Sequence, residues 1–233
     1  MPTRANALAV MAKAPIPGMV KTRLTPPLSD LQACALYRAL LLDQLDNLLG
    51  LSEIDLYVAF TPDDAAPLIE SIVPPGFRCF AQRGANLGVR MNQVFAELWR
   101  RGHRHLVLIG SDLPTLQLQI LRQAFAHLDV RDRQVVFGPS QDGGYYLVGT
   151  NRLIPEIFSG MSWSHDEVLA ETLAKLRDLG IKVDLLAGGF DVDIIADVQR
   201  LHGASWAEQA AGKRTQACLE LLSALPQLSR FFE

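Results

Sequence analysis

The chain has 233 residues, of which 49% are hydrophobic and 20% are charged, a balance that suits one globular domain or a domain with a short appendage. Its formal net charge is −3, from 22 Lys and Arg and 25 Asp and Glu residues. This near-balanced charge argues against a nucleic-acid or membrane-surface partner. Any binding of anions must therefore come from a local cluster of cations.

The cysteines and the apolar runs bear on the cellular compartment. Cys34, Cys79 and Cys218 lie far apart and form no Cys-x-x-Cys pair, which is typical of reduced thiols in a cytoplasmic protein. The first apolar run ends at Lys13 and is too short for a signal peptide. No apolar stretch approaches the roughly 18 residues that a membrane span needs. We therefore expect a cytoplasmic protein with no membrane partner.

Short apolar runs alternate with helical patterns along most of the chain. The runs predict strands at 7–11, 54–60, 77–81, 106–109, 134–138, 145–149 and 181–186. The segments between them predict helices that begin near positions 29, 65, 87, 115, 163 and 193, with helix and tail after 203. Such alternation is typical of a mostly parallel sheet with helices on both faces. Only a short Gly-rich link separates 134–138 from 145–149, so we expect one of these two strands to be antiparallel.

Three of the predicted helices begin at recognisable caps. Ser29 and Gln32 have the spacing of a capping box, and Ser164 and Glu167 repeat that spacing. Thr115 is placed to cap the helix that follows the strand 106–109. These positions predict where each helix starts.

The segment 12–24 (AKAPIPGMVKTRL) directly follows the first predicted strand. A loop at this point opens at the carboxyl edge of the sheet, where α/β folds bind their ligands. Its two prolines stiffen the loop, and Gly18 lets the backbone approach a bound group. Lys13, Lys21 and Arg23 then present cations that suit a di- or triphosphate. The alternative is a solvated basic loop beside a turn.

Two familiar phosphate-binding motifs are absent. A Walker A loop needs Gly directly before its Lys and another Gly five residues earlier, but Val20 and Pro15 occupy these positions. No Gly-x-Gly-x-x-Gly follows the first predicted strand, which argues against a nicotinamide oxidoreductase.

Carboxylates follow two other predicted strands. Asp112 comes directly after the strand 106–109 and is a candidate ligand for Mg²⁺ or Mn²⁺, which take their remaining ligands from water and substrate phosphates. The alternative is that Asp112 caps the next helix. Asp193, and less strongly Asp191, follow the last strand and offer a second carboxylate for the same ion. Asp193 is equally well placed to cap the helix after it.

Three further segments carry candidate binding residues. Asp142, Gly143, Gly144 and Tyr145 lie between two strands, where Asp142 can accept a hydrogen bond from an acceptor hydroxyl and the glycines leave room for a ligand. A plain hairpin turn is the alternative, because Asp-Gly is common in such turns. Candidates elsewhere are Trp163 and His165, which precede a helix and can face an acceptor or nucleotide, and Gly88, which can let a base or ribose approach.

These motifs together resemble a known family. They occur in a fixed order within residues 6–200: Lys13-Ala-Pro-Ile-Pro-Gly18, Lys21-Thr-Arg-Leu24, Leu87-Gly88, Gly110-Ser-Asp-Leu-Pro114, Asp142-Gly-Gly-Tyr-Tyr146, Trp163-Ser164 and Asp191-Val-Asp193. In this order they resemble the radical-SAM/selenodomain-associated transferases, which are described as glycosyltransferases with the nucleotide-diphospho-sugar transferase (GT-A) fold. Lys-Thr-Arg-Leu and Asp112-x-Pro114 also look like phospholactate and molybdenum-cofactor guanylyltransferases. A typical glycosyltransferase metal site carries Asp-x-Asp, where this chain has Gly110-Ser111-Asp112.

The resemblance implies a three-layer α/β/α domain of this type over residues 1–203, with a mixed, mostly parallel seven-stranded sheet. Residues 204–233 read as a C-terminal helical extension. The resemblance also implies a divalent ion, Mg²⁺ or Mn²⁺, and a nucleotide bound across the first half of the sheet.

We therefore expect a metal-dependent transferase that acts on a nucleotide or nucleotide sugar and a small-molecule acceptor. Lys21, Asp112 and Asp142 are the predicted catalytic residues, and Asp112 with Asp193 the predicted metal ligands. The predicted nucleotide-binding residues are Lys13, Gly18, Lys21, Arg23 and Gly88. The predicted acceptor side comprises Gly143, Gly144, Tyr145, Trp163 and His165. Glycosyl transfer is preferred, with nucleotidyl transfer and nucleotide binding without turnover as the alternatives.

Overall fold

The computed structural model describes residues 4–129, 134–163, 165–203 and 212–232. In this part of the chain seven strands form one sheet in the order β3-β2-β1-β4-β6-β5-β7. Only β6 runs against its neighbours, β4 and β5, and every other neighbouring pair is parallel. The strands are β1 (Asn6–Lys13), β2 (Asp55–Thr61), β3 (Phe77–Ala81), β4 (His105–Ile109), β5 (Gln134–Pro139), β6 (Tyr145–Thr150) and β7 (Lys182–Leu185). The predicted mixed sheet, with one reversed strand within 134–149, is confirmed.

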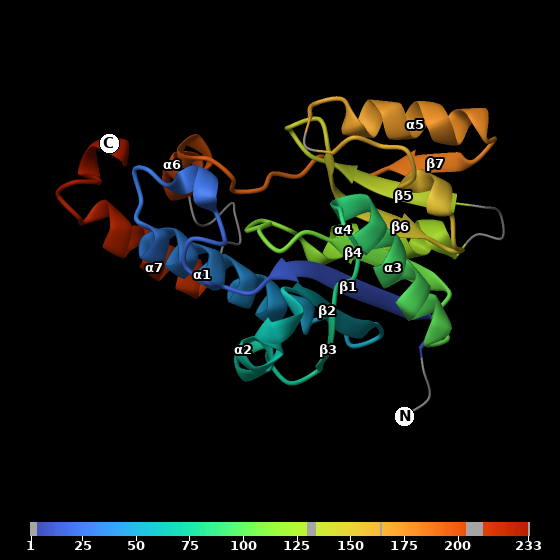
Figure 1. Cartoon of the computed structure of the whole chain (residues 1–233), viewed down its shortest axis with the longest axis horizontal. Coiled ribbons are helices and arrows are strands. Elements are labelled where there is room, and N and C mark those ends of the chain that lie inside the picture. Colours follow the sequence, from blue (N-terminus) through green and yellow to red (C-terminus); the bar gives the residue numbers. More distant parts are fainter. Residues whose placement is uncertain (1–3, 130–133, 164, 204–211, 233) are drawn as a thin grey trace.

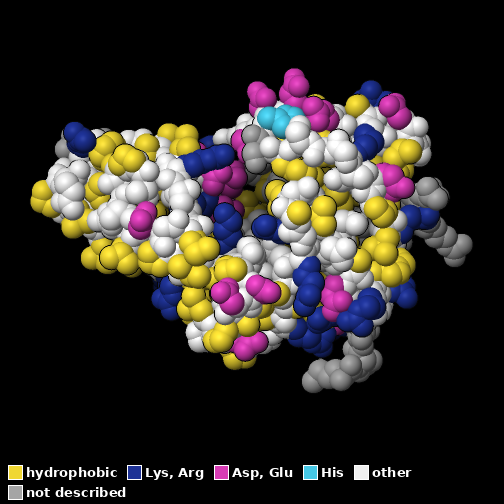
Figure 2. All heavy atoms as spheres, in the orientation of Figure 1, with side chains coloured by type: hydrophobic (Ala, Val, Ile, Leu, Met, Phe, Trp, Pro, Cys, Tyr) yellow, Lys and Arg dark blue, Asp and Glu magenta, His cyan; other side chains and the backbone are white. Residues whose placement is uncertain are grey.

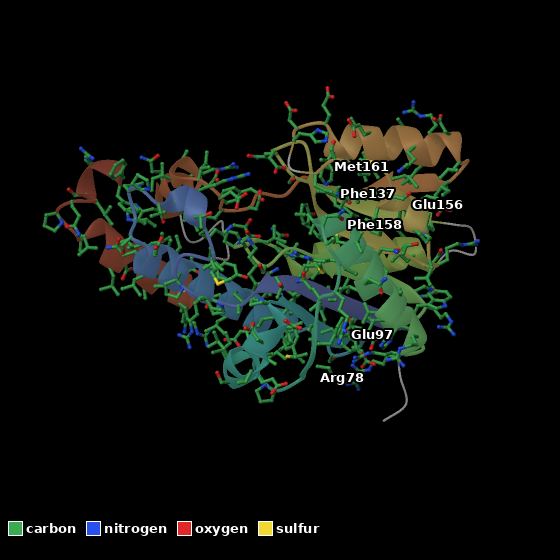
Figure 3. All side chains as sticks on the ribbon, in the orientation of Figure 1. Arg78, Glu97, Phe137, Glu156, Phe158 and Met161 are labelled. Atoms are coloured by element: carbon green, nitrogen blue, oxygen red, sulfur yellow. The ribbon has the colours of Figure 1, made fainter. Side chains whose placement is uncertain are left out.

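Helices cover both faces of this sheet (Figure 1). One face packs against α1 (Asp30–Leu48), α2 (Ala66–Ile72) and α4 (Leu118–Leu128), and the other against α3 (Leu87–Arg100) and α5 (Val168–Asp178). On the second face Phe95 stacks on Phe158, with ring centroids 5.6 Å apart, and Phe137 of β5 belongs to the same core (Figure 3). The predicted three-layer α/β/α architecture is therefore confirmed.

Helix α1 is buried on two sides. Leu41 and Leu45 face the core under the sheet, whereas Leu36 and Leu40 pack into a separate core with α6 (Ile195–Gly203) and α7 (Lys213–Ser223). A helix that is buried on two sides needs apolar residues on both of them, and α1 accordingly has no single apolar stripe. Figure 1 shows α6, α7 and the C-terminus gathered at this end of the molecule, beside α1.

The helix caps agree with the sequence in one case and differ in another. Ser29 and Gln32 form the predicted capping box at the start of α1. The predicted Thr115 cap is wrong, because α4 begins at Leu118 after Gln117, which forms no side-chain cap. The buried side chains of Leu113 and Leu116 hold the segment before α4 in a turn, and Asn47 donates a hydrogen bond to the Leu116 carbonyl at 3.0 Å. The predicted capping box at Ser164 lies outside the described residues.

The C-terminal helix α7 is attached to α1 through one carboxylate. Asp43 is nearly buried and accepts hydrogen bonds from the backbone N–H of Thr215 at 2.7 Å and of Arg214 at 3.3 Å. The Arg214 guanidinium donates to the same carboxylate at 3.1 Å. The two backbone donors are N–H groups of the first turn of α7, which have no partner within the helix. Residues 212–232 share a core with α1, and we propose that they belong to a C-terminal extension that follows residue 203.

Replacement of Asp43 by Ala is expected to lower the free energy of unfolding by about 1.5–3 kcal/mol, because it leaves the first turn of α7 without its charged acceptor. Asp46→Ala is the matched control. Asp46 lies one turn away on α1, and its carboxylate forms an ion pair with the half-exposed Arg214 at the surface, so its removal is expected to cost about 0–1 kcal/mol. Urea unfolding followed by circular dichroism measures both values, and equal losses would contradict the proposed role of Asp43.

Candidate functional site

A cavity of about 670 Å³ opens at the carboxyl edge of the central strands. Its walls come from the loop after β1, the loop after β4, the turn between β5 and β6, the segment before α5 and the segment after β7. Figure 2 shows a hollow in the middle of the molecule with Asp or Glu and Lys or Arg side chains gathered beside it. All the predicted site residues except Gly18, Gly88 and Gly143 line this cavity.

Lys21 lies at the centre of the charged wall. Its Nζ atom donates hydrogen bonds to Oδ2 of Asp112 and, at 2.8 Å, to Oδ1 of Asp193. The Lys21 side chain is only 5% exposed. Arg23 reaches the other oxygen of Asp193 at 3.5 Å from the solvent side. Three chain segments, after β1, after β4 and after β7, therefore meet in one ion cluster.

The backbone of Lys21 adopts a left-handed conformation, with φ 48° and ψ 39°. It is the only residue other than glycine with positive φ in the described part of the chain. A left-handed residue with a side chain costs about 1–2 kcal/mol, and such costs persist where surrounding contacts over-determine the conformation. The two carboxylate contacts of Lys21 supply that compensation.

Burial alone lowers the pKa of Lys21, but the adjacent carboxylates of Asp112 and Asp193 outweigh it and hold the pKa above its ordinary value. The ammonium therefore stays charged at neutral pH. The same two effects act on Asp193 in the opposite directions. Burial raises its pKa, but the charge of Lys21 outweighs burial and brings the pKa below its ordinary value.

A buried tyrosine fixes the two loops that carry this cluster. The hydroxyl of Tyr37 on α1 lies 2.9 Å from both the backbone N and O of Lys13 and 3.0 Å from Oγ of Ser111. Burial raises the pKa of Tyr37 to about 12, so the phenol stays neutral. Tyr37 thus holds the end of β1 beside Ser111, the residue before Asp112.

Asp193 does not cap α6. The backbone N–H groups of Asp193 and Ile194 instead donate to Oδ2 of Asp197, at 2.9 and 2.8 Å. A carboxylate in the first turn of the helix therefore satisfies these donors, and the carboxylate of Asp193 is left for Lys21 and Arg23.

Asp191 is the carboxylate that sequence reasoning undervalued. It lines the cavity, and its pKa is raised to about 6, first by burial and then by the negative charges of Asp112, Asp193 and Asp142. Lys21 and Arg23 therefore do not neutralise the whole carboxylate cluster. Sequence position alone had suggested a role, since Asp191 follows the last strand. Of its like-charged neighbours, Asp193 lies in the same segment, whereas Asp112 and Asp142 come from two other segments.

The turn between β5 and β6 is the predicted hairpin. Oδ1 of Asp142 accepts a hydrogen bond from the hydroxyl of Ser140 and another from the backbone N–H of Gly144 at 3.0 Å. Asp142 therefore closes the turn with one oxygen while its side chain lines the cavity. No sequence motif indicated Ser140, whose hydroxyl orients this carboxylate.

Three glycines do not offer the open backbone that was expected. Gly18 lies in an exposed turn outside the cavity. A Cβ atom at Gly88 would come within 2.5 Å of the Trp163 ring, so the indole fills the space expected for a base or ribose. A Cβ at Gly143 would lie 1.8 Å from the backbone oxygen of Asp166. Gly88 and Gly143 therefore allow the segment before α5 to pack closely against α3 and the hairpin.

The aromatic wall of the cavity contains Trp163 and Tyr145. The Tyr145 ring packs on Phe137 with centroids 4.8 Å apart, and its buried hydroxyl has no hydrogen-bond partner among the described residues. Burial raises the pKa of Tyr145, so this phenol is a neutral donor. Nε2 of His165 lies 3.0 Å from the Ser162 hydroxyl, and its Nδ1 accepts from the Glu167 N–H at 3.3 Å. His165 is therefore held in place on both sides of its ring.

The donor set of the cavity fits a hard divalent cation. Asp112 and Asp193 direct one oxygen each at a common point, and Asp191 lines the same cavity as a third carboxyl group. Mg²⁺ is commonly held by one or two carboxylates together with substrate phosphates. Within the described residues no three His, Cys, Asp or Glu side chains converge as a complete metal site. The residues therefore suit an ion that takes further ligands from water or substrate.

We expect Asp191→Asn to stabilise the metal-free protein at pH 7.5. A carboxyl group whose folded pKa is raised stabilises the fold below its unfolded pKa and loses that stabilisation as the pH rises through the folded value of about 6. Asn mimics the protonated form and should recover on the order of 1 kcal/mol after allowance for solvent screening. Urea unfolding in EDTA at pH 4.0, 6.0 and 7.5 measures this gain. A gain that does not shrink as the pH falls would assign it to something other than ionisation.

Several solved structures are similar to the structure of this chain. The structure of a Desulfovibrio desulfuricans G20 protein, provisionally described as a nucleotide-diphospho-sugar transferase, is similar over 98% of this chain and 99% of its own, with 29% identity and a TM-score of 0.86. At 12% identity, 4-diphosphocytidyl-2C-methyl-D-erythritol synthase of Anaerococcus prevotii DSM 20548 matches 82% of this chain and 91% of its own, with a TM-score of 0.53. A Bacillus anthracis protein, provisionally described as a glucose-1-phosphate thymidylyltransferase, matches 96% and 99% at 12% identity, with a TM-score of 0.52.

The first of these similarities confirms the predicted nucleotide-diphospho-sugar transferase fold, and the other two agree with that fold alone. No curated protein matches the chain. None of the helices in the described ranges combines the length and apolar character of a membrane span. The family model described as "Uncharacterized protein conserved in bacteria (DUF2064)" matches residues 44–165. This match covers more than half of the sequence, and the chain therefore belongs to the DUF2064 family.

Proposed function

We propose that this protein is a metal-dependent transferase that binds an activated nucleotide through its phosphates and transfers a glycosyl group to a small hydroxylated acceptor. The single observation that carries the proposal is the ion cluster of Lys21, Asp112 and Asp193 on the wall of the cavity. The near-complete match to the Desulfovibrio protein, provisionally described as a nucleotide-diphospho-sugar transferase, supports the transferase class. We further propose that the protein is related to the radical-SAM/selenodomain-associated transferases, because its sequence motifs occur in the same order.

The cations of the loop after β1 support phosphate binding. Lys13, Lys21 and Arg23 all line the cavity, and Arg23 is exposed with only a weak contact to Asp193. A guanidinium in this state can take two phosphate oxygens without breaking a buried pair. In the proposed reaction these three side chains neutralise the phosphates of the leaving nucleotide.

Asp112 and Asp193 would hold Mg²⁺ or Mn²⁺. When bound, the ion would stabilise negative charge on the leaving phosphate. The chain itself supplies position and charge: Tyr37 and Ser111 fix the loops, and Lys21 supplies a permanent cation. Little proton transfer is needed for a phosphate leaving group, since charge stabilisation is the main requirement.

The hairpin and the aromatic wall would form the acceptor side. Asp142 has one oxygen committed to Ser140 and Gly144, which orients the carboxylate so that the other can accept a hydrogen bond from an acceptor hydroxyl. Gly144, Tyr145, Trp163 and His165 line the same side of the cavity. Gly143 contributes by letting the segment before α5 reach this wall.

Two alternatives remain distinct from this proposal. A nucleotidyltransferase would bind a triphosphate with the same cations and release pyrophosphate. The Gly110-Ser111-Asp112 sequence favours this alternative, because a typical glycosyltransferase metal site has Asp-x-Asp at this place. A nucleotide-binding protein without turnover would have no use for an oriented carboxylate opposite the phosphates, and the position of Asp142 weighs against it. Glycosyl transfer is preferred because the sequence motifs match a family described by that activity.

Asp112→Asn is expected to weaken Mn²⁺ binding in the presence of a nucleoside diphosphate by at least about tenfold, because an amide cannot replace a charged ligand. The overall fold should be retained. Calorimetric titration with Mn²⁺ measures the change, and circular dichroism checks the fold. Asp129→Asn removes an 82% exposed carboxylate far from the cavity and serves as the control. Unchanged Mn²⁺ affinity in the Asp112 variant would remove this residue from the metal site.

The reaction itself is tested by its leaving group. The protein is incubated with Mg²⁺ or Mn²⁺ and a panel of sugar nucleotides and nucleoside triphosphates, without and with small hydroxylated acceptors. Glycosyl transfer or slow hydrolysis gives a nucleoside diphosphate, whereas nucleotidyl transfer gives pyrophosphate. We expect nucleoside diphosphate from one sugar nucleotide, and its absence in the Asp112→Asn variant. Pyrophosphate from a triphosphate, with every sugar nucleotide intact, would replace the proposal by its nucleotidyl alternative.

A further inference from the structure

Lys21 occupies the point at which the proposed metal ligands converge. Its Nζ atom lies within hydrogen-bond distance of one oxygen from Asp112 and one from Asp193. An ion that coordinated these same two oxygens would lie about 2.0–2.2 Å from each of them, which is closer than any ammonium nitrogen can usefully approach. The two cations cannot share this position, since their charges repel and their volumes overlap.

We propose that the ammonium of Lys21 is a built-in placeholder for the divalent cation, and that metal enters between Asp112 and Asp193 only as Lys21 leaves them. This inference rests on the proposed function, because it takes the divalent ion from there. It adds a role that phosphate binding by Lys21 does not require. Lys21 would oppose metal binding in the free protein and assist the reaction only after it has moved.

The surroundings of Lys21 explain why an exchange is feasible. The left-handed backbone of Lys21 is unfavourable on its own and is offset by the two carboxylate contacts. The turn that precedes Lys21 is exposed at Gly18 and Met19. When an incoming phosphate offers the ammonium a new partner, the cost of leaving Asp112 and Asp193 falls. The side chain is long and unbranched, and can swing without a large movement of the loop.

The charge balance of the cavity gives the exchange a direction. In the free protein Lys21 pairs with Asp112 and Asp193, and Arg23 pairs with Asp193. Removal of Lys21 alone would therefore leave two carboxylates, with Asp191 in the same cavity, facing one another with too little positive charge. A phosphate ligand brings further negative charge and draws Lys21 away, and a divalent cation then restores the balance. Metal and phosphate ligand therefore assist each other's binding, and this coupling is reciprocal by thermodynamic necessity.

The experiment measures Mn²⁺ binding in the absence of any nucleotide. Lys21→Met removes the ammonium but keeps a long, unbranched side chain, and Lys21→Gly removes it while allowing the left-handed backbone without strain. Both variants are expected to bind Mn²⁺ at least about tenfold tighter than the parent, because two charge-assisted hydrogen bonds no longer compete with the ion. Electron paramagnetic resonance of free Mn²⁺ measures the affinity, and thermal shift with Mn²⁺ gives a second readout.

Lys13→Met is the matched control. Lys13 lines the same cavity and carries the same charge, but its side chain forms no ion pair within the described ranges. A general electrostatic effect would tighten Mn²⁺ binding equally in the Lys13 and Lys21 variants, whereas the placeholder predicts a clear gain only at Lys21. The gain should also disappear in the double variant Lys21→Met/Asp112→Asn, which places the ion at the vacated carboxylate.

The outcomes separate this inference from the proposed function. If the Lys21 variants bind Mn²⁺ no tighter than the parent, or no tighter than Lys13→Met, the placeholder is wrong while a metal-dependent reaction can still stand. If the parent binds no Mn²⁺ even with a nucleoside diphosphate, and the Lys21 variants bind it tightly alone, the inference holds and the metal-dependent reaction fails. If none of the proteins binds Mn²⁺ under either condition, both are overturned.

Discussion

The ion cluster of Lys21, Asp112 and Asp193 is the constraint on which the functional edge of this protein depends. The three residues come from segments that follow β1, β4 and β7, and no backbone pairing joins β7 to the other two strands. Buried charges are costly unless they are paired, so each segment must reach the others for any of them to be satisfied. Lys21 is also the only non-glycine residue in the described ranges with a left-handed backbone.

The reversed strand β6 is the second device that builds the site. Because β6 runs antiparallel to β5, the chain turns back at the carboxyl edge and leaves a tight hairpin there, in place of a crossover that would carry it to the far side of the sheet. That hairpin places Asp142 on the wall of the cavity that also contains Lys21 and Arg23 from the loop after β1. It also supplies the Gly143 backbone, whose carbonyl accepts the Leu169 N–H at 3.0 Å and so docks the start of α5. One local reversal therefore positions two walls of the cavity.

Much of this arrangement could be predicted because it follows from local patterns. Apolar runs located all seven strands, the Ser29–Gln32 spacing located the start of α1, and a short Gly-rich link predicted the reversal at β6. The edge on which Lys21 and Asp112 meet also follows from the chain direction of their strands. Thr115 failed as a cap because tertiary burial of Leu113 and Leu116 overrode its local preference.

The remainder depends on contacts between distant segments, which a single sequence does not encode in any short window. The contacts of Lys21 with Asp112 and Asp193 join residues up to 172 positions apart. The pKa of Asp191 is raised first by burial in the fold and then by carboxylates that include the distant Asp112 and Asp142. Gly88 and Gly143 illustrate the same limit. A bare backbone reads equally well as space for a ligand or as space for Trp163 and Asp166, and only the fold distinguishes these readings.

Helix α6 extends the reach of the site into the C-terminal layer. Its Asp197 holds the backbone of Asp193, while its Arg200 donates a hydrogen bond to Gln141 at the tip of the hairpin, at 2.7 Å. Its apolar side shares a core with α1 and α7. A change in how α7 seats on α1 would therefore strain both walls of the cavity through α6, without altering any residue that touches a ligand. Substitutions in these outer helices would therefore change the spacing between the loop after β1 and the hairpin while every cavity-lining residue stays the same.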